Sequence, residues 1–309
     1  MTENPEISLV IPLYNEEENL HALYQELVSV LNEINRPAEV IFVDDGSLDK
    51  SFEMVKELSI RDNRIKGISL SRNFGHQVAL TAGLQHARGE MVITLDADLQ
   101  HPPKEIPRLI EQYNLGFDIV NTRRIDTSEI GYFKKNSSRL FYRMINRISE
   151  VPITESSSDF RLMSRKALDS FLQFTEKGRF TRGLVSWMGY RQTVIDYICH
   201  PRFAGKSKYT LRKMLHFAAE GITAFSAKPL RMASYVGVIV FLLGLLYAVY
   251  AIIRHISGET IPGWTSLLVT VLLLGGIQLL TLGVIGEYLA RIFNESKSRP
   301  LYFIRDQTS

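Results

Sequence analysis

The chain has 309 residues, a formal net charge of +3 and 22% charged residues, so its length is that of about two domains. A hydrophobic content of 45% and a single cysteine, Cys199, exclude a disordered chain, a collagen and a scaffold held by internal disulfides. The first residues are acidic and contain no apolar segment, unlike a signal peptide.

The first 125 residues alternate short apolar runs with segments of helical length. The apolar runs predict strands at Ile7–Pro12, Glu39–Val43, Ile65–Leu70, Met91–Leu95 and Asp118–Asn121. The segments between them predict helices at Glu17–Asn35, Lys50–Asp62, His76–Ala87 and Lys104–Leu115. Nearly continuous apolar strands that alternate with helices indicate right-handed βαβ units. The sequence therefore predicts an α/β domain with a mainly parallel sheet.

Residues 126–228 are more basic and less regular, and they contain two amphipathic segments at about 131–149 and 210–226. Each segment could simply pack its apolar face on a protein core. Because both precede long uncharged segments, we favour helices that lie at a membrane surface.

Two uncharged segments predict a transmembrane hairpin. Met232–Ile253 has 22 residues without a charge and Thr260–Gly286 has 27. At about 1.5 Å per residue, 22 helical residues span roughly 33 Å, which exceeds a hydrocarbon core of about 30 Å. We expect a soluble domain at 1–228, helices at about 230–254 and 262–288 within 229–294, and a tail at 295–309.

Basic residues flank both predicted spans, and the connecting loop carries few of them. By the positive-inside rule, the large domain and both termini are expected to be cytoplasmic, at the inner membrane. Small residues on the second span, such as Gly276 and Gly283, favour close helix contact. A homo-oligomer, with a tetramer among the options, is therefore expected.

Polar motifs follow the first two predicted strands. Pro12-Leu13-Tyr14-Asn15-Glu16 ends the first, and Asp44-Asp45-Gly46-Ser47 ends the second. Ligands of open α/β sheets bind beyond the carboxyl ends of the strands, where both motifs fall. The alternatives are a helix cap at Asn15 and an ordinary Asp-Gly turn.

A third motif, Asp96-Ala97-Asp98-Leu99-Gln100, follows the fourth predicted strand. In an extended chain Asp96, Asp98 and Gln100 project to the same side. Their oxygens are the ligands that Mg²⁺ or Mn²⁺ takes, usually together with substrate phosphates. The alternative is a polar turn without a metal.

In order and spacing these motifs resemble those of the inverting family 2 glycosyltransferases of the GT-A fold. Within that family the chain resembles the polyprenyl-phosphate glycosyltransferases, namely dolichyl-phosphate mannose synthases and bacterial enzymes of the GtrB type. Further motifs that carry the resemblance are Arg72-Asn73-Phe74-Gly75-His76, Asp159-Phe160-Arg161 and Arg202-Phe203-Ala204-Gly205-Lys206-Ser207-Lys208-Tyr209. The resemblance implies a GT-A (Rossmann-like) catalytic domain at 1–228. It also implies transfer of one sugar, first of all glucose from UDP-glucose, to polyprenyl (undecaprenyl) phosphate.

The resemblance also implies roles for individual residues. The nucleotide sugar is assigned to Pro12, Tyr14, Asn15, Glu16, Asp44, Asp45, Ser47, Arg72, Gly75, Asp96, Ala97 and Asp98. The divalent cation is assigned to Asp96, Asp98 and Gln100, and the catalytic roles to Asp159, Asp98 and Arg161. The acceptor phosphate is assigned to Arg123, Lys134, Ser138 and Arg139, and a loop over the donor to Lys206, Ser207, Lys208 and Tyr209. Asp159 is expected either to take the residual proton of the acceptor as a base or to position the acceptor or Arg161. The loop could instead be a basic linker.

Several alternatives remain open at this point. The donor could be a UDP-aminoarabinose type sugar, a UDP-N-acetyl sugar or GDP-mannose, because no motif fixes the sugar. The chain also lacks the Gln-x-x-Arg-Trp motif of processive members, so a single transfer is favoured over polymerisation. A non-catalytic membrane scaffold is the rival from another class. Nucleic-acid binding is disfavoured because the basic residues lie beside the hydrophobic segments.

Overall fold

The computed structural model describes residues 5–125, 157–177, 181–198, 228–257 and 263–308. The chain forms two compact units, which are described separately. The first contains the described residues up to 198 together with 299–308, and the second contains those from 228 to 298. The expected interface helices at 131–149 and 210–226 lie outside the described residues.

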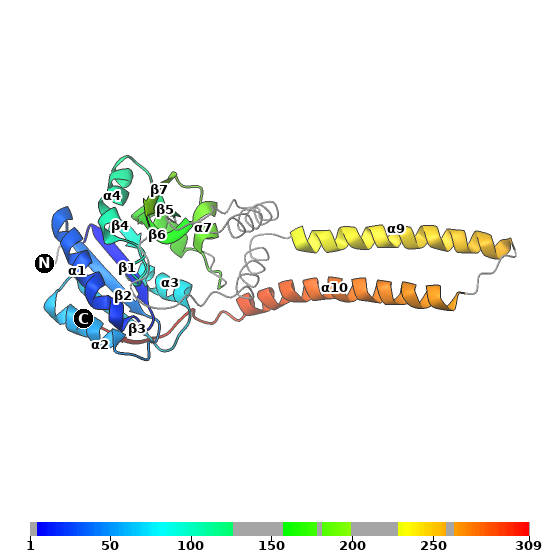
Figure 1. Cartoon of the computed structure of the whole chain (residues 1–309), viewed down its shortest axis with the longest axis horizontal. Helices are drawn as coiled ribbons and strands as arrows, with labels where there is room; N and C mark the ends of the chain where they lie inside the picture. Colours follow the sequence, from blue (N-terminus) through cyan, green and yellow to red (C-terminus); the bar gives the residue numbers. More distant parts are fainter. Residues whose placement is uncertain (1–4, 126–156, 178–180, 199–227, 258–262, 309) are drawn as a thin grey trace. The chain divides into compact units, whose positions relative to one another are not determined.

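The first unit is built on one sheet (Figure 1). Its strands are β1 (Ile7–Leu13), β2 (Ala38–Asp44), β3 (Ile65–Leu70), β4 (Met91–Thr94), β5 (Ile119–Ile125), β6 (Ser157–Ser164), β7 (Gln192–Ile198) and β8 (Ile304–Gln307). They follow the spatial order β7-β5-β6-β4-β1-β2-β3-β8. The neighbours β4, β1, β2 and β3 run parallel, as do β5 and β7, whereas β6 and β8 are antiparallel to their partners. The predicted α/β class with a mainly parallel sheet is confirmed.

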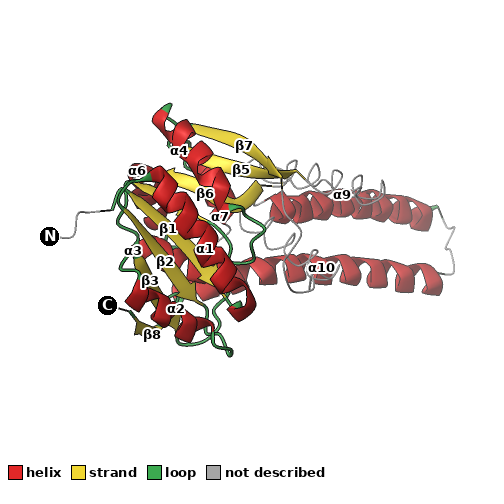
Figure 2. Ribbon diagram, turned by 60° about the vertical axis from the view of Figure 1, so that its left-hand side comes forward, coloured by secondary structure: helices red, strands yellow, loops and turns green. Residues whose placement is uncertain are grey.

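Helices flank this sheet (Figure 2). They are α1 (Glu17–Ile34), α2 (Ser51–Arg61), α3 (His76–His86), α4 (Ile106–Asn114), α6 (Arg165–Leu172) and α7 (Thr181–Trp187), with a short 3-10 turn at Pro103–Glu105. All seven residues of β1 are buried, which is expected of a central strand with both faces covered. The bounds of α1, α2 and α3 agree with the predicted ones to within one residue. Helix α4 starts at Ile106 because the preceding prolines form the 3-10 turn.

Three strands were not expected from the sequence. Strands β6 and β7 lie on one side of the sheet, and β8 lies at the opposite edge. Strand β8 falls in the segment 295–309, which the sequence suggested to be a tail. It pairs antiparallel with β3, and the Thr308 N–H donates to the Gly67 carbonyl at 2.9 Å. The end of the chain is therefore part of the sheet.

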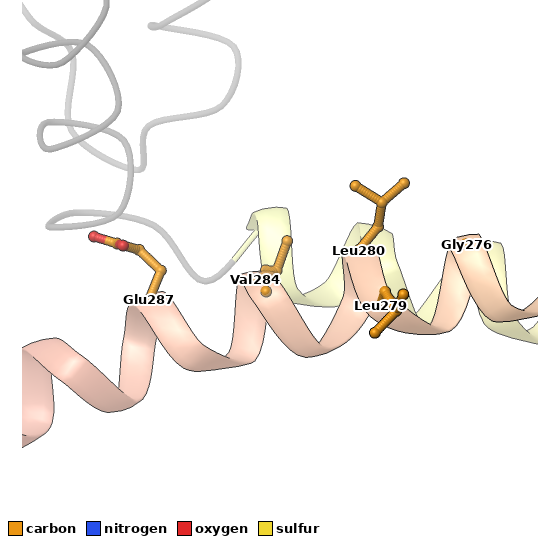
Figure 3. A pocket seen from close by; sticks show the side chains of 6 residues that line it. Gly276, Leu279, Leu280, Val284 and Glu287 are labelled. Carbon is orange, nitrogen blue, oxygen red and sulfur yellow. The ribbon is translucent and has the colours of Figure 1, made fainter.

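The second unit contains the helices α9 (Lys228–Ile256) and α10 (Trp264–Ser296), which run antiparallel beside each other (Figure 1). Leu230–Arg254 and Val269–Ser296 are long and apolar enough to cross a membrane, and their apolar windows are not buried in the protein. Residues of successive turns of α10 line a shallow, open pocket (Figure 3): Gly276, Leu279, Leu280, Gly283, Val284 and Glu287. The predicted hairpin is thus present as two apolar helices.

Candidate active site

The loops after β1 and β2 are joined at the carboxyl edge of the sheet. Leu13 lies opposite Asp44 in the parallel register, so the residues that follow both strands come together. The Asn15 N–H donates to Ser47 Oγ at 2.9 Å, and Asn15 Oδ1 accepts from the Leu48 N–H at 2.8 Å. Asn15 has a φ of 56°, a left-handed conformation that asparagine tolerates. Asn15 and Ser47 therefore shape this edge by holding the two loops to each other.

The two adjacent carboxylates after β2 have different partners. Asp44 is buried, and it accepts from the Ser47 N–H at 2.9 Å and from the Ser69 hydroxyl at 2.8 Å. Asp45 accepts from the N–H groups of Phe74 and Gly75 at 2.7 and 2.9 Å. Burial raises the pKa of the Asp45 carboxyl above its ordinary value, although both N–H donors oppose this shift. Asp45 thus anchors the loop after β3.

Gly46 allows the loops after β2 and β3 to approach closely. Its φ is 70°, and a Cβ at this position would lie 2.5 Å from the backbone carbonyl carbon of Arg72. Any other residue would therefore push the two loops apart. The loop after β3 carries Arg72, whose guanidinium lies 4.3 Å from the centre of the Phe74 ring.

The expected nucleotide-binding residues differ in their exposure. Tyr14 and Arg72 are exposed at this edge, with Tyr14 at 41% of its surface. Pro12 is buried within β1, and Glu16 accepts from the Asn19 amide at 2.5 Å. Tyr14 and Arg72, together with the exposed Asn15, are thus accessible to a ligand, while Pro12 is part of the buried strand.

The motif after β4 forms a turn and does not continue the strand, so the predicted extended geometry is wrong. Strand β4 ends at Thr94, Leu99 has a left-handed φ of 59°, and Asp98 Oδ1 accepts from the Gln100 N–H at 3.1 Å. Because Asp98 closes this turn, the three side chains do not alternate as in a strand. Gln100 Oε1 accepts from Arg124 at 3.2 Å, and Ala97 is buried.

The turn after β4 offers few protein ligands for a cation. In the described part of the chain, no three His, Cys, Asp or Glu side chains are grouped as a ready-made metal site. The Asp96 carboxylate is 34% exposed, and that of Asp98 is partly exposed. Two accessible carboxylates fit a divalent cation that takes its other ligands from diphosphate and water.

His101, to which the sequence motifs gave no role, supports this turn through a hydrogen bond with its backbone. Its Nδ1 accepts from the Asp96 N–H at 3.0 Å, so the ring proton is on Nε2, 2.6 Å from Ser158 Oγ. The ring is buried and stacks on Phe160 at 5.4 Å. The only signal in the sequence was the position of His101 directly after the Asp96–Gln100 motif.

Asp159, on β6, is surrounded by donors. Its Oδ1 accepts from Arg161 at 3.1 Å and from Arg182 at 3.3 Å, and its Oδ2 accepts from Gln77 at 3.0 Å. Burial opposes ionisation, but His76 and the two guanidinium groups hold the pKa of the Asp159 carboxyl well below its usual range. Asp159 is therefore a buried carboxylate with its oxygens already engaged.

His76 links Asp159 to the motif after β4. Its Nε2 lies 3.6 Å from Asp159 Oδ2 and 3.5 Å from Asp96 Oδ1. The cost of desolvating the imidazolium lowers the pKa of His76, but the nearby carboxylates of Asp159 and Asp96 outweigh it and raise this pKa to about 9. Asp159 on β6 and Asp96 in the turn after β4 thus share one imidazolium, a contact that spacing along the chain did not reveal.

Arg161 and Arg123, for which catalytic and acceptor-binding roles were expected, are each paired with an aspartate. Arg161 is fully buried, and burial lowers its pKa to about 10, so it stays charged at neutral pH while it contacts Asp159. Arg123 forms a two-point ion pair with Asp196 at 2.7 and 2.8 Å. The other residues expected at the acceptor and in the loop, Lys134, Ser138, Arg139, Lys206, Ser207, Lys208 and Tyr209, lie outside the described residues.

The chain matches two family models. Residues 8–172 match glycosyl transferase family 2, and residues 228–292 match the GtrB C-terminal hairpin. Together with the two apolar helices, the hairpin match indicates that the protein associates with a membrane.

Curated relatives cover almost the whole chain. The glycosyltransferase YkcC of Bacillus subtilis is 44% identical over 99% of this chain and 95% of its own. The bactoprenol glucosyl transferase of Shigella phage SfV is 40% identical over 97% of this chain and 98% of its own. Among solved structures, the mannosyltransferase PcManGT of Pyrobaculum calidifontis, in complex with GDP-Man and Mn²⁺, is 16% identical over 84% of each chain, with a TM-score of 0.47. On the family match and these relatives, the chain belongs to glycosyltransferase family 2, whose GT-A fold its first unit adopts.

Proposed function

We propose that the protein transfers one glucose from UDP-glucose to undecaprenyl phosphate, with inversion, at the cytoplasmic face of the inner membrane. The observation that carries this proposal is the similarity to bactoprenol glucosyl transferases, which extends through the hairpin and not only over the catalytic domain. The loop arrangement and the carboxylates around His76 support it. The basic residues that flank both apolar helices support the orientation.

On the donor side, the loops after β1, β2 and β3 form the nucleotide site. Tyr14 and Arg72 contact the nucleotide, while Asp44 and Asp45 keep the loops in place. Asp96 and Asp98 would hold a divalent cation, Mg²⁺ or Mn²⁺, which would supply positive charge to offset that of the departing diphosphate. The carboxylates of Asp96 and Asp98 are both partly exposed, which supports this role.

On the acceptor side, the chemistry needs no strong base. A phosphate monoester has a second pKa of about 6, so at neutral pH it is already an anion that can attack the anomeric carbon. Asp159 is engaged by Gln77, Arg161 and Arg182, so its role is to position these groups and His76. Attack from the side opposite the leaving diphosphate converts an α-linked donor sugar into a β-linked lipid product.

The test uses the purified full-length protein, undecaprenyl phosphate and Mg²⁺ or Mn²⁺. Radiolabelled UDP-glucose, UDP-N-acetylglucosamine, UDP-aminoarabinose and GDP-mannose are supplied one at a time, and label is counted in an organic extract. UDP-glucose is expected to label the lipid, and the label is expected to disappear with a chelator or in Asp98→Asn.

The matched control is Asp169→Asn, because Asp169 is an exposed residue of α6. This variant is expected to keep wild-type transfer. Labelling from a different donor would correct the sugar, and an α-linked product would contradict inversion. If the wild-type protein unfolds in a cooperative transition and yet gives no label from any donor, the non-catalytic scaffold is favoured.

A further inference from the structure

The segment 302–308 is attached to the catalytic sheet at several points. Strand β8 pairs with β3 so that Asp306 lies opposite Ser69 and Ile304 opposite Leu70. Lys56 Nζ forms an ion pair with Asp306 Oδ2 at 2.5 Å, and the Tyr302 hydroxyl donates to Gln85 Oε1 at 2.6 Å. These contacts, from α2, α3 and β3, fix the strand that carries Arg305.

The Arg305 guanidinium lies near the buried carboxylate of Asp44, in the loops that we propose to bind the donor. Its Nη2 lies 2.9 Å from Ser69 Oγ and 3.8 Å from Asp44 Oδ2. The directions of these hydrogen bonds are consistent, because Ser69 accepts from Arg305 and uses its single O–H to donate to Asp44. Among the residues that the structure describes, Arg305 is the cation within ion-pair distance of Asp44.

Hydrogen bonds also connect the Asp44 carboxylate to the loops after β2 and β1. Asp44 Oδ1 accepts from the Ser47 N–H, and Ser47 Oγ accepts from the Asn15 N–H, each at 2.9 Å. Arg305, Ser69, Asp44, Ser47 and Asn15 therefore form one chain of hydrogen bonds. This chain runs from the C-terminal strand to the loop after β1.

We propose that Arg305 is a positioning residue for the donor nucleotide. It acts through Ser69 and Asp44, and this role rests on the proposed donor site. Two adjacent buried carboxylates, Asp44 and Asp45, repel each other, and the Arg305 guanidinium, 3.8 Å from Asp44 Oδ2, offsets the charge of Asp44. A residue far along the chain, beyond the membrane hairpin, thus sets the shape of the nucleotide site.

Arg305→Met in the full-length protein tests this role, because methionine keeps part of the apolar stem and removes the charge. UDP binding in the presence of Mn²⁺ is measured by calorimetry, and the donor KM and kcat are measured with undecaprenyl phosphate. The UDP Kd and the donor KM are expected to rise about tenfold, with kcat changed by less than about threefold. Arg305→Lys, which retains the charge, is expected to restore part of the affinity.

Lys56→Met provides the matched control. It removes the other ion pair of β8, through Asp306, and Lys56 has no contact with Asp44. UDP affinity is expected to stay at the wild-type value in this variant. An equal loss of UDP affinity in Lys56→Met and Arg305→Met would overturn the proposal, since the cause would then be general loosening of the strand. Wild-type affinity in Arg305→Met would overturn it as well.

Hydrogen exchange separates this proposal from the proposed function. The Ser47 N–H is bonded to Asp44, so its exchange is expected to be faster in Arg305→Met than in wild type and Lys56→Met. Unchanged exchange in an enzyme that still transfers sugar would overturn the role of Arg305 and leave the function intact. A wild-type protein that transfers no sugar, yet shows the faster exchange in Arg305→Met, would overturn the function while supporting the chain of hydrogen bonds.

Discussion

Asp159 accepts hydrogen bonds from Gln77, Arg161 and Arg182, and these contacts support the positioning role that we propose for it. Asp159→Asn places an amide N–H₂ among donors and leaves the two guanidinium groups without their carboxylate. We expect kcat to fall on the order of 100-fold, because the groups around the reacting atoms lose their alignment. The donor KM is expected to change little. Steady-state kinetics with both substrates check this.

The pH dependence of the residual activity distinguishes positioning from base catalysis by Asp159. If the acceptor phosphate is the titrating group, activity falls as the pH drops below about 6, because the phosphate monoester becomes protonated. The same midpoint is then expected in wild type and Asp159→Asn. Loss of this acidic limb in the variant would show that Asp159 is the base.

We expect His101 to affect the proposed cation site through the backbone of Asp96. His101→Phe keeps the ring that stacks on Phe160 but removes the acceptor of the Asp96 N–H. The concentration of Mn²⁺ that gives half-maximal activity is expected to rise at least about tenfold, as for other residues that support metal ligands. A titration of activity with Mn²⁺ measures this. His86→Gln, at the end of α3, is the control, and an equal effect there would contradict the role of His101.

At the scale of elements, Glu39 joins the starts of β1, β2 and β3. Its carboxylate accepts from Ser8 at 2.6 Å, from the Arg88 N–H at 2.8 Å and from Lys66 at 2.5 Å. Burial alone would raise the pKa of Glu39, but these donors outweigh it and lower the pKa below the ordinary value. The folded state therefore gains stability from ionised Glu39 above the pKa of the unfolded chain. It loses this gain as the pH falls through the lower, folded value.

Glu39→Gln is accordingly expected to reduce the free energy of unfolding at pH 7 by about 1–3 kcal/mol. The difference from wild type is expected to shrink as the pH falls from the ordinary glutamate pKa, about 4.3, through the lower pKa of folded Glu39, where the wild-type carboxyl becomes protonated as well. Denaturant unfolding of the first unit in the full-length protein, at pH 7 and at acidic pH, measures both values. Glu57→Gln, an exposed i,i+4 partner of Arg61, is expected to cost less than about 0.5 kcal/mol.

The strands and helices up to Asn121 could be predicted because their own residues carry the signal, as in the buried run of β1. Strand β6 could not, because Asp159 and Arg161 interrupt its apolar pattern and become favourable only when they pair with each other. Strand β8 has the short sequence Ile-Arg-Asp-Gln, and only its pairing with β3 makes it a strand.

Part of the candidate site could likewise be predicted from the sequence. The motifs identified which strand ends carry polar residues, and the structure brings the loops after β1, β2 and β3 together. The turn at Asp98 could not be predicted, because its left-handed Leu99 has no signature in the residue type. The links of His76 and Arg305 to aspartates far away in the sequence arise only from the fold.

At the scale of the whole molecule, the catalytic unit is discontinuous in the sequence, since β8 follows both apolar helices. A chain that ends at residue 298 lacks β8 and leaves the edge of β3 unpaired. We expect the first unit of such a chain to unfold roughly 5–10 °C below wild type. Thermal unfolding monitored by circular dichroism checks this. A chain that ends at Thr308 serves as the control, and equal melting temperatures would contradict a structural role for β8.

The position of β8 in the sequence also has a consequence in time. Synthesis proceeds from the N-terminus, so seven strands of the sheet leave the ribosome before the two apolar helices, and the eighth leaves after them. While the hairpin is being translated, the edge of β3 lacks its partner β8, because the residues of β8, including Arg305, have not yet been synthesised. The sheet is therefore completed only when the helices that anchor the chain have already been made. A chain released before that point carries neither the finished edge nor the last contact of the donor loops.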